Sequence, residues 1–338
     1  MDRRIIIIMA MLMAAACTKQ VVEDSAAEYI RLDAGVAPTK ALIESSSDLR
    51  TSGNELTLYD VHTKADGTLF QYMTDQVVTS DGSRWGFVDG LGNAVEIPWT
   101  KRGFHHFLAF VSKYGGKEIT STDLTVGYKA PEEGEYAEDH KIVIPADGGK
   151  LTIGPSMGYD FMYASAARNV VMQGTGTVQL EMKHLFAAVT FQILNMSGSP
   201  MTINSFELDG MRVTGSAEIG HGTLPVIALD EAPDESGFDV SGQSVAAAMG
   251  STYKLHGGDF LIWPHISDYY ADLSFSLTYT LGTGSPADPV SFSLTTANPE
   301  VISWDAGCRY IYTITISDHI LFDVVKVVDW INDDVILQ

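Results

Sequence analysis

The chain has 338 residues, of which 45% are hydrophobic, and it carries a net charge of −22. A surface this acidic repels nucleic acid and anionic lipid headgroups, and no basic patch with interleaved aromatic residues is visible, so nucleic acid is not an expected partner. The sequence holds 31 glycines and only two cysteines. This composition is typical of an all-β protein with many turns.

The N-terminus has the features of an export signal. Arg3 and Arg4 precede the apolar run Ile5–Ala16, which is shorter than the roughly 20 residues that a membrane-spanning helix needs. The run ends in small residues suited to a signal peptidase, directly before Cys17. It resembles the signal of a bacterial lipoprotein, and an ordinary cleaved signal with an incidental cysteine is the alternative. We predict a signal peptide over residues 1–16 and lipidation of Cys17.

Residues 17–49 are predicted to form a lipidated leader or linker. The segment is polar and lacks clear periodicity after Leu32, and it contains Pro38 and several serines. Tyr29–Leu32 could still form a short strand.

From residue 50 onward, short alternating runs predict strands that are separated by Asp-Gly turn pairs. In the first half these are Asn54–Tyr59, Trp85–Val88, Val95–Trp99, Phe104–Val111, Lys141–Pro145, Lys150–Ile153 and Asp160–Ala166. The runs on both sides of Asp147–Gly149 are expected to pair as a hairpin. The Gly- and Thr-rich segment Gln173–Thr177 is the predicted joint between two domains.

The stretch Val178–Leu194 has the clearest alternation of the chain, and its parity changes once. Even-numbered positions from Val178 to Met182 are apolar, whereas the apolar residues from Leu185 onward occupy odd positions. A strand that keeps one face on a core cannot switch parity without an extra residue. We therefore predict a bulge or sharp bend near Lys183–His184.

The second half of the chain predicts a similar number of strands. They are Ile203–Leu208 and Met211–Thr214, expected as a hairpin, followed by Phe260–Trp263, Leu273–Leu281, Tyr310–Ile316 and Phe322–Trp330. Two halves with about the same number of strands suit two β-sandwiches, which we place at residues 50–174 and 175–338.

Motifs that would carry chemistry are weak. Gly154–Gly158 matches the G-x-S-x-G pattern of a nucleophile elbow, but a strand and not a helix is predicted to follow, so Ser156 is interpreted as a turn residue. The histidines show no metal-ligand spacing, and no cofactor motif is present. His105 and His106 should point to opposite faces of a strand, one half-buried and one solvated. The five tryptophans are expected to pack in the core rather than to form a sugar-binding platform.

Several segments together resemble the fimbrillin family of Bacteroidota surface pili. They are, in chain order, the lipoprotein signal at Cys17, Phe104–Gly115 (FHHFLAFVSKYG), Asp160–Ala166 (DFMYASA), Val178–Asn195 (VQLEMKHLFAAVTFQILN), Asn204–Gly210 (NSFELDG), Phe260–His265 (FLIWPH), Trp304–Ile316 (WDAGCRYIYTITI) and Val327–Trp330 (VVDW). No single segment is diagnostic, but their order and spacing cover almost the whole mature chain.

The resemblance implies two tandem transthyretin-like β-sandwich domains and a lipoprotein precursor that is carried to the outer membrane surface. It also implies that a trypsin-like protease removes the leader, at a junction that corresponds to Lys40 and Ala41, although the family usually has Arg at this position. Loss of a leader strand would open a hydrophobic groove. A strand of the neighbouring subunit would then fill it by backbone pairing, and repeated contacts that do not close would build a filament.

The same resemblance places the inter-subunit strand near the C-terminus. The residues concerned are Val324, Val325, Val327, Val328, Trp330, Val335, Ile336 and Leu337. Because only Ile331–Gln338 follow the V-V-D-W segment, this tail could instead be the end of the last strand of the second sandwich.

These observations lead to a prediction of a non-enzymatic structural subunit of a cell-surface fimbria, assembled by strand exchange. The expected partners are other fimbrial subunits, the outer membrane through a lipid anchor, and host surface ligands; no metal or cofactor is expected. The alternative is a monomeric surface lipoprotein that binds glycan or protein ligands through its loops. The fimbrial hypothesis predicts a ladder of oligomers, whereas the monomeric alternative predicts none.

Overall fold

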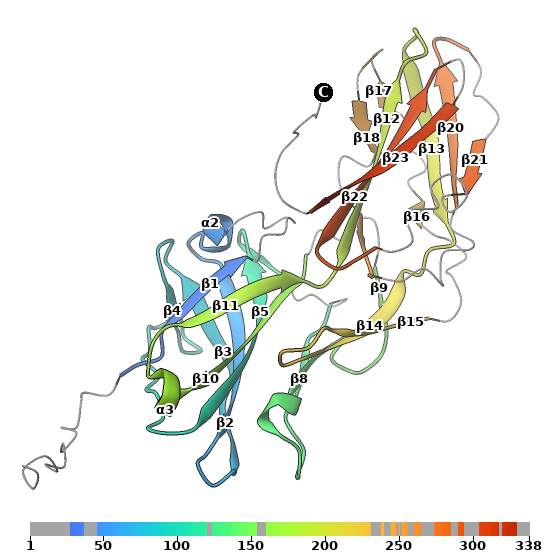
Figure 1. Ribbon diagram of the computed structural model, residues 1–338. Coiled ribbons are helices and arrows are strands. Elements are labelled where there is room, and N and C mark those ends of the chain that lie inside the picture. Colours follow the sequence, from blue (N-terminus) through green and yellow to red (C-terminus); the bar gives the residue numbers. More distant parts are fainter. Residues whose placement is uncertain are drawn as a thin grey trace, which may run out of the picture.

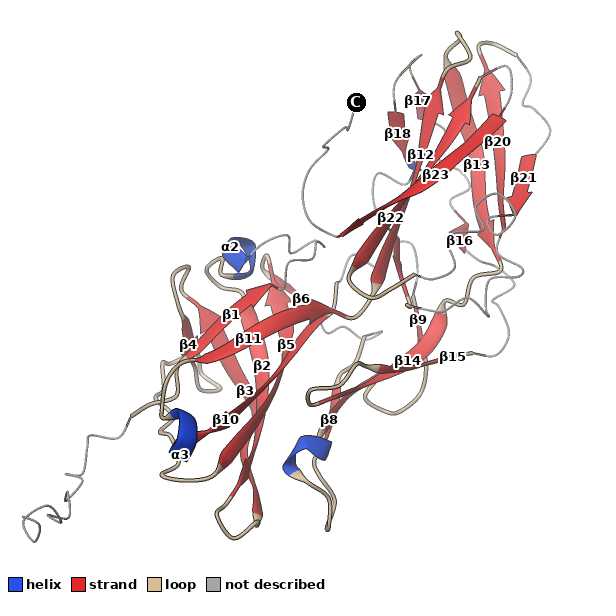
Figure 2. Cartoon of the chain, viewed as in Figure 1, coloured by secondary structure: helices blue, strands red, loops and turns tan. Residues whose placement is uncertain are grey.

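The computed structural model describes residues 28–36, 46–119, 124–153, 160–230, 238–239, 245–247, 250, 252–255, 260–264, 274–284, 290–293, 304–317 and 320–329. Within these residues the protein is almost entirely β-sheet, which confirms the predicted fold class (Figure 1, Figure 2). The helical segments are single turns: α2 (Ser46–Leu49), η1 (Ala137–Asp139) and α3 (Val170–Gln173). No helix in this part of the chain is long and apolar enough to cross a membrane.

The largest sheet has eight strands in the order β1-β11-β10-β5-β2-β3-β4, with β6 added beside β5. Its strands are β1 (Leu32–Val36), β2 (Glu55–Thr63), β3 (Leu69–Ser80), β4 (Trp85–Phe87), β5 (Phe104–Tyr114), β6 (Lys117–Glu118), β10 (Met162–Asn169) and β11 (Val178–His184). The pairs are antiparallel except for β1 and β11, which run parallel. One predicted strand is wrong: Val95–Trp99 forms only an isolated bridge, between Pro98 and Tyr29.

A smaller sheet packs against this one, in the order β15-β14-β8-β7 with β9 beside β14. Its strands are β7 (Gly127–Lys129), β8 (Lys141–Ile144), β9 (Leu151–Thr152), β14 (Thr214–Gly220) and β15 (Val226–Leu229). Tyr59 of β2 stacks on Tyr128 of β7 with ring centroids 4.1 Å apart, so the two sheets face each other. The predicted hairpin across Asp147–Gly149 is wrong, because β8 and β9 pair one after the other along β14 and not with each other.

Two five-stranded sheets form the other end of the molecule (Figure 1). One has the order β18-β12-β22-β23 with β19, and the other β16-β13-β20-β21 with β17. The strands are β12 (Ala187–Asn195), β13 (Met201–Asp209), β16 (Phe238–Asp239), β17 (Val245–Ala247), β18 (Thr252–Lys254), β19 (Phe260–Ile262), β20 (Ser274–Leu281), β21 (Val290–Ser293), β22 (Cys308–Ile316) and β23 (Ile320–Asp329). Phe191 and Phe206 meet between them with ring centroids 4.9 Å apart, and burial of such aromatic surface dominates the energy of a core.

The parity change predicted near Lys183–His184 corresponds to a change of sheet. The chain bends at Leu185–Phe186, directly after β11, and β12 then enters the other end of the molecule. Along β11 buried and exposed residues alternate strictly, whereas both faces of β12 are covered from Ala187 to Phe191. One continuous apolar stretch therefore connects two cores.

The sheets group into two pairs, an arrangement consistent with two β-sandwiches (Figure 2). Hydrogen-bonded pairing nevertheless crosses the boundary that the sequence predicts after residue 174. Strand β11 pairs with β10, and β14 pairs with β8. The predicted hairpin of Ile203–Leu208 with Met211–Thr214 is wrong for the same reason, because β13 and β14 belong to different sheets.

Candidate functional site

The leader contributes the edge strand of the eight-stranded sheet. Strand β1 runs parallel to β11, with Leu32 opposite Val178 and Val36 opposite Met182. The side chains of Ile30, Leu32 and Ala34 are buried in the core of this sheet. A segment that the sequence analysis treated mainly as a linker therefore fills an apolar groove along β11, which we call the leader groove.

The leader also pairs with the segment that follows β4. The carbonyl of Arg31 accepts a 2.8 Å hydrogen bond from the Val178 amide of β11. On its other side the Ile30 amide donates to the Ile97 carbonyl at 2.8 Å, and the Trp99 amide donates to the Glu28 carbonyl at 2.9 Å. Residues 28–36 thus satisfy backbone groups of β11 and of the segment after β4, and their removal would leave both sets of groups unpaired.

A helical turn and an arginine hold β1 from the side. Arg50 Nη2 lies 2.5 Å from Asp33 Oδ1, and α2, which ends one residue earlier, is fixed by hydrogen bonds from Asn54 Nδ2 to the carbonyls of Asp48 and Leu49 at 3.0 Å. Both partners of the ion pair are about one-third exposed, so it adds little free energy. Its contribution is to position the strand, while burial of the apolar side chains supplies most of the stabilisation, about 1.5–3 kcal/mol for a fully buried leucine.

The predicted lipidation site and the two predicted processing residues lie outside the described residues. They are Cys17, Lys40 and Ala41. Because β1 ends at Val36, a cut after Lys40 would leave no covalent link between β1 and the rest of the sheet.

The predicted inter-subunit strand falls partly on β23. The residues Val324, Val325, Val327 and Val328 lie in this strand, which pairs antiparallel with β22 of the same chain at the edge of its sheet. Trp330, Val335, Ile336 and Leu337 lie outside the described residues. Exchange between subunits therefore stays a prediction for the whole segment.

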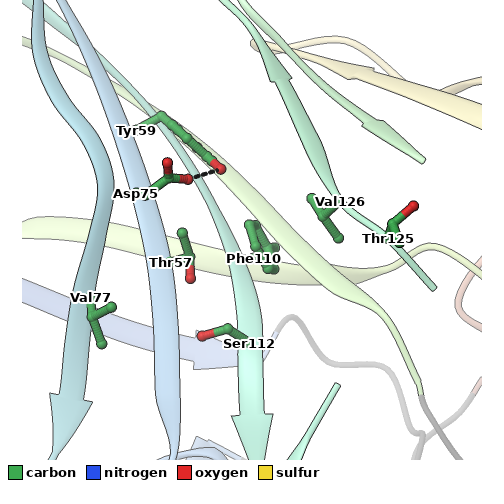
Figure 3. Close-up of a pocket in the computed structure, with 8 residues that line it drawn as sticks. All are labelled: Thr57, Tyr59, Asp75, Val77, Phe110, Ser112, Thr125 and Val126. Atoms are coloured by element: carbon green, nitrogen blue, oxygen red, sulfur yellow. Dashed lines mark hydrogen bonds between the residues drawn. The ribbon is translucent and has the colours of Figure 1, made fainter. Parts of the chain in front are cut away.

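A pocket of about 470 Å³ opens on the face of the eight-stranded sheet (Figure 3). It is lined by Thr57, Tyr59, Asp75, Val77, Phe110, Ser112, Thr125 and Val126. The Tyr59 hydroxyl donates a 2.5 Å hydrogen bond to Asp75 Oδ1, and burial raises the pKa of Tyr59 well above its usual value, so the phenol remains a donor. Asp75 has a φ of 51°, and it is the one non-glycine residue with positive φ in the described part of the chain. The pocket offers hydroxyls, a carboxylate and aromatic surface to a polar ligand.

A buried polar network lies inside the eight-stranded sheet. His105 Nδ1 lies 2.5 Å from Asp60 Oδ2, and His105 Nε2 lies 2.7 Å from Thr100 Oγ1. The order Asp–His–hydroxyl resembles that of a hydrolase triad. However, the imidazole has no exposed surface, so a substrate cannot reach it. Burial raises the pKa of the Asp60 carboxyl, and the hydrogen bonds from His105 and from the His106 amide oppose this shift.

His105 and His106 point to opposite faces of β5, as predicted, but their surroundings differ from the prediction. His106 is half-buried, as expected for one of the two. The expectation that the other is solvated is wrong, because the His105 side chain is completely buried in the network around Asp60. The sequence showed two adjacent histidines, and only the packed sheet revealed that a buried carboxylate from β2 meets one of them.

His106 also meets two histidines that the sequence analysis did not connect with it. Its ring centroid lies 5.1 Å from that of His221, which in turn lies 6.2 Å from that of His140. The register of β8 and β14 explains this proximity, because Lys141 pairs with Gly220 and the residues just beyond this pair are His140 and His221. We call these three residues the histidine cluster. No three His, Cys, Asp or Glu side chains among the described residues have an arrangement that could hold a metal ion.

Two other candidates from the sequence can be placed only in part. The pattern around Ser156 lies outside the described residues, but the element that follows it is the strand β10 and not the helix of a nucleophile elbow. Trp85, Trp99, Trp263 and Trp304 are buried, as predicted for core residues, and Trp330 lies outside the described residues.

Comparison with known proteins identifies the family. A family model described as fimbrillin-like matches residues 50–330. No curated protein matches the chain with significant similarity. Among solved structures, a candidate cell adhesion protein from Bacteroides ovatus has a TM-score of 0.55 at 14% identity, covering 91% of this chain and 100% of that one. A fimbrial protein from Bacteroides vulgatus has a TM-score of 0.54 at 12% identity, covering 89% and 99%.

At these identities the structural likeness shows the fold alone, and it extends over nearly the full length of the chain. The family model covers every sheet of the structure, from β2 to the end of β23, and leaves out only the leader with β1 and the last residues. This chain belongs to the fimbrillin-like family.

Proposed function

We propose that the protein is a structural subunit of a cell-surface fimbria and that it polymerises by strand exchange after its leader is cut. The observation that carries this proposal is β1: a leader strand fills an apolar groove beside β11 and lies before the candidate cleavage junction at Lys40 and Ala41. The fimbrillin-like family match supports the fimbrial role. Acylation of Cys17 would hold the precursor at the outer membrane until this cut.

The proposed mechanism exchanges one strand for another in the leader groove. While the chain is intact, β1 has a very high effective concentration next to β11 and excludes competitors. After cleavage, the described contacts that still hold β1 are non-covalent: its backbone hydrogen bonds, its buried apolar side chains and the Asp33–Arg50 pair. A strand from another subunit could then replace it through the same backbone pairing and the same alternate apolar positions.

We assign the donor to the C-terminal segment. Strand β23 already lies at the edge of its sheet, and residues 330–338 follow it. A strand at the edge of a sheet can pair with a neighbouring subunit without unfolding its own, and head-to-tail repetition of this contact gives an open filament.

The test compares two chains that differ only in the leader. The first starts at residue 18, and the second starts at Ala41. We expect the longer chain to remain monomeric and the shorter chain to form a ladder of oligomers in size-exclusion chromatography with light scattering and in electron microscopy. A monomeric Ala41 chain, or equal polymerisation of both chains, would contradict the proposal.

Two controls assign the groove and the donor. A peptide of residues 28–40 added in excess should suppress polymerisation of the Ala41 chain, and the same peptide carrying Leu32→Asp and Ala34→Asp should not, because charged side chains cannot enter the buried positions. Removal of residues 330–338 from the Ala41 chain should also abolish the ladder if this tail is the donor.

A second candidate function is ligand binding by the single subunit, which the pocket beside Asp75 favours. A glycan or peptide with hydrogen-bond donors would suit its carboxylate and hydroxyls. Binding of a glycan or peptide library to the monomeric longer chain, with loss of binding in Asp75→Ala, would support this function. Host surface ligands are proposed on this basis.

A further inference from the structure

The histidine cluster lies where the small sheet meets the eight-stranded sheet. His106 belongs to β5 of the large sheet, whereas His140 precedes β8 and His221 follows β14 of the small sheet. The turn that begins at His221 is also tied to β10, because the Gly222 amide donates a 3.1 Å hydrogen bond to Ser165 Oγ. Three imidazoles from both sheets thus occupy one junction.

Each of these rings has a buried nitrogen without a hydrogen-bond partner among the described residues. The atoms are His106 Nδ1, His140 Nε2 and His221 Nε2. Buried polar atoms are nearly always paired in folded proteins, so three unpaired nitrogens in one place require an explanation. The His140 side chain is completely buried, which makes its unpaired nitrogen the most costly of the three.

The hydrogen bonds around Tyr128 determine which nitrogen of His140 can take up a proton. The Tyr128 hydroxyl donates to Gln71 Oε1 at 2.8 Å, and it lies 3.1 Å from His140 Nδ1. Since the single hydroxyl proton is used for Gln71, His140 Nδ1 must donate to the Tyr128 oxygen. Neutral His140 therefore carries its proton on Nδ1, and the unpaired Nε2 has a free lone pair.

The charges around the cluster do not favour a cation inside it. Among the described residues, Glu138 of η1 is the one carboxylate in ion-pair range of the cluster, and its Oε2 lies 4.0 Å from His106 Nε2 with about half of its side chain exposed. On the far face of β5, Asp60 is already bonded to His105. The other charged groups of the small sheet, Lys129, Lys141 and Glu218, bind one another. A proton on His140 would therefore meet two further imidazoles and, within the part of the chain that the structure describes, no direct counter-ion.

We propose that the histidine cluster is a proton-operated junction, in which acidification loosens the small sheet from the eight-stranded sheet. In the closed junction the rings of His106, His140 and His221 pack against one another and hold the sheets together. Below pH 6.5, opening of the junction releases the imidazoles of His106 and His140 to water, where each can bind a proton. The opened junction thus binds more protons than the closed one, and falling pH shifts the equilibrium toward opening.

The pKa values agree with this direction. Burial, together with the neighbouring His221 and His106, lowers the pKa of His140 from 6.5 to about 3. Burial is also the main cause of the lowered pKa of His106. For a histidine whose pKa is lowered by folding, the stability contribution is complete above pH 6.5 and is lost as the pH falls below it. At pH 5, His140 alone should increase the population of the opened junction about thirtyfold.

Hydrogen–deuterium exchange of the whole mature chain tests the proposal. Exchange rates at pH 7.5 and pH 5.0, corrected for the intrinsic pH dependence of amide exchange, give protection factors for each strand. We expect the protection factors of β8 and β14 to fall about thirtyfold at pH 5.0, with a much smaller change in β2 and β3. Unchanged protection in β8 and β14, or an equal loss in all four strands, would overturn the proposal.

Substitutions in the cluster provide the second arm. His140→Gln keeps a donor for Tyr128 but cannot titrate, so the acid-dependent loss in β8 and β14 should shrink to less than about threefold. His106→Gln removes a half-buried member and should reduce the loss in part, which keeps the test decisive if His140→Gln folds poorly. His62→Gln is the matched control, because it removes a histidine of β2 outside the cluster, and it should retain the full loss. Retention of the full loss in both cluster variants would overturn the proposal.

Discussion

The two faces of β5 place neighbouring histidines in opposite electrostatic surroundings. His105 packs against a buried carboxylate, Asp60, with 2.5 Å between Nδ1 and Oδ2. His106, the next residue, meets the imidazole of His221, and the one carboxylate within 4.0 Å of it among the described residues is that of Glu138, which is about half exposed. Both arrangements bury imidazole, but only the first supplies a partner that can balance a positive charge.

This difference shows that the neighbours, and not the residue type, decide what a buried histidine does to stability. A carboxylate and an imidazole in contact can share a proton within a network that stays neutral overall. In the histidine cluster, burial and the neighbouring imidazoles instead lower the pKa values of His140 and His106, so protonation of these two rings is disfavoured while the junction is closed. Strand β5 therefore has a stabilising polar contact, Asp60–His105, on one face and the acid-sensitive histidine cluster on the other.

The largest effect is expected when the contact between Asp60 and His105 is removed. Asp60→Ala leaves His105 Nδ1 and the His106 amide without their carboxylate partner in a fully buried site. Loss of one partner of a buried pair typically costs about 3–5 kcal/mol. We expect a decrease of this size in the free energy of unfolding, measured by urea denaturation at pH 7.5.

The double variant Asp60→Leu with His105→Phe is the control for this prediction. Because it removes both partners and fills their volume, we expect it to lose less stability than Asp60→Ala. If the free energy of unfolding of Asp60→Ala lies within about 1 kcal/mol of that of the wild type, the network around Asp60 does not stabilise the fold as proposed.

The second-largest effect is expected when the histidine cluster is given a carboxylate partner, as Asp60 provides for His105. His221→Glu places a carboxylate beside His140, which should raise the pKa of His140 toward its ordinary value. Since His140 with a pKa of about 3 makes the wild type lose roughly 2 kcal/mol between pH 7.5 and pH 5, we expect this loss to fall below about 1 kcal/mol. Urea denaturation at both pH values measures the difference.

His221→Gln is the matched control, because it removes the same imidazole without adding a charge. It should weaken the acid dependence less than His221→Glu does. Equal effects of the two variants would mean that steric change, and not the missing carboxylate, distinguishes the two faces of β5.

The smallest effect is expected at Glu138, the carboxylate of the described residues that already faces the cluster. Glu138→Gln removes a side chain that is 53% exposed and 4.0 Å from His106 Nε2. Water screens such pairs, so the free energy of unfolding should change by no more than a few tenths of a kcal/mol. A loss above about 1 kcal/mol at pH 6 would show that Glu138 is a true counter-ion of His106.

Prediction from sequence worked best where one face of a strand is buried and the other is exposed. The alternation from Val178 to Met182 correctly predicted β11, and the parity change correctly indicated a bend before β12. Prediction failed where turn signals suggested local hairpins, as at Asp209–Gly210. Local turn chemistry cannot tell whether the next strand pairs with its neighbour or enters another sheet, because β14 obtains its partners β8 and β15 from different parts of the chain.

The candidate site was predicted unevenly for a similar reason. The resemblance to fimbrillins pointed to the leader, but the weak periodicity around Leu32 gave little reason to expect β1, whose parallel pairing depends on β11 far away in the chain. The histidine cluster had no signal at all in the sequence. His140 and His221 become neighbours only through the register of β8 with β14, and His106 joins them only when the two sheets pack.

The sequence by itself determined the all-β class, the positions of most strands and the family, because side-chain alternation and turn residues act over a few neighbouring positions. The tertiary structure decided which strands share a sheet, that the leader completes one of them, and which histidine meets a carboxylate. Those outcomes depend on contacts between residues distant in the chain, and their energies arise only when packing removes both partners from water.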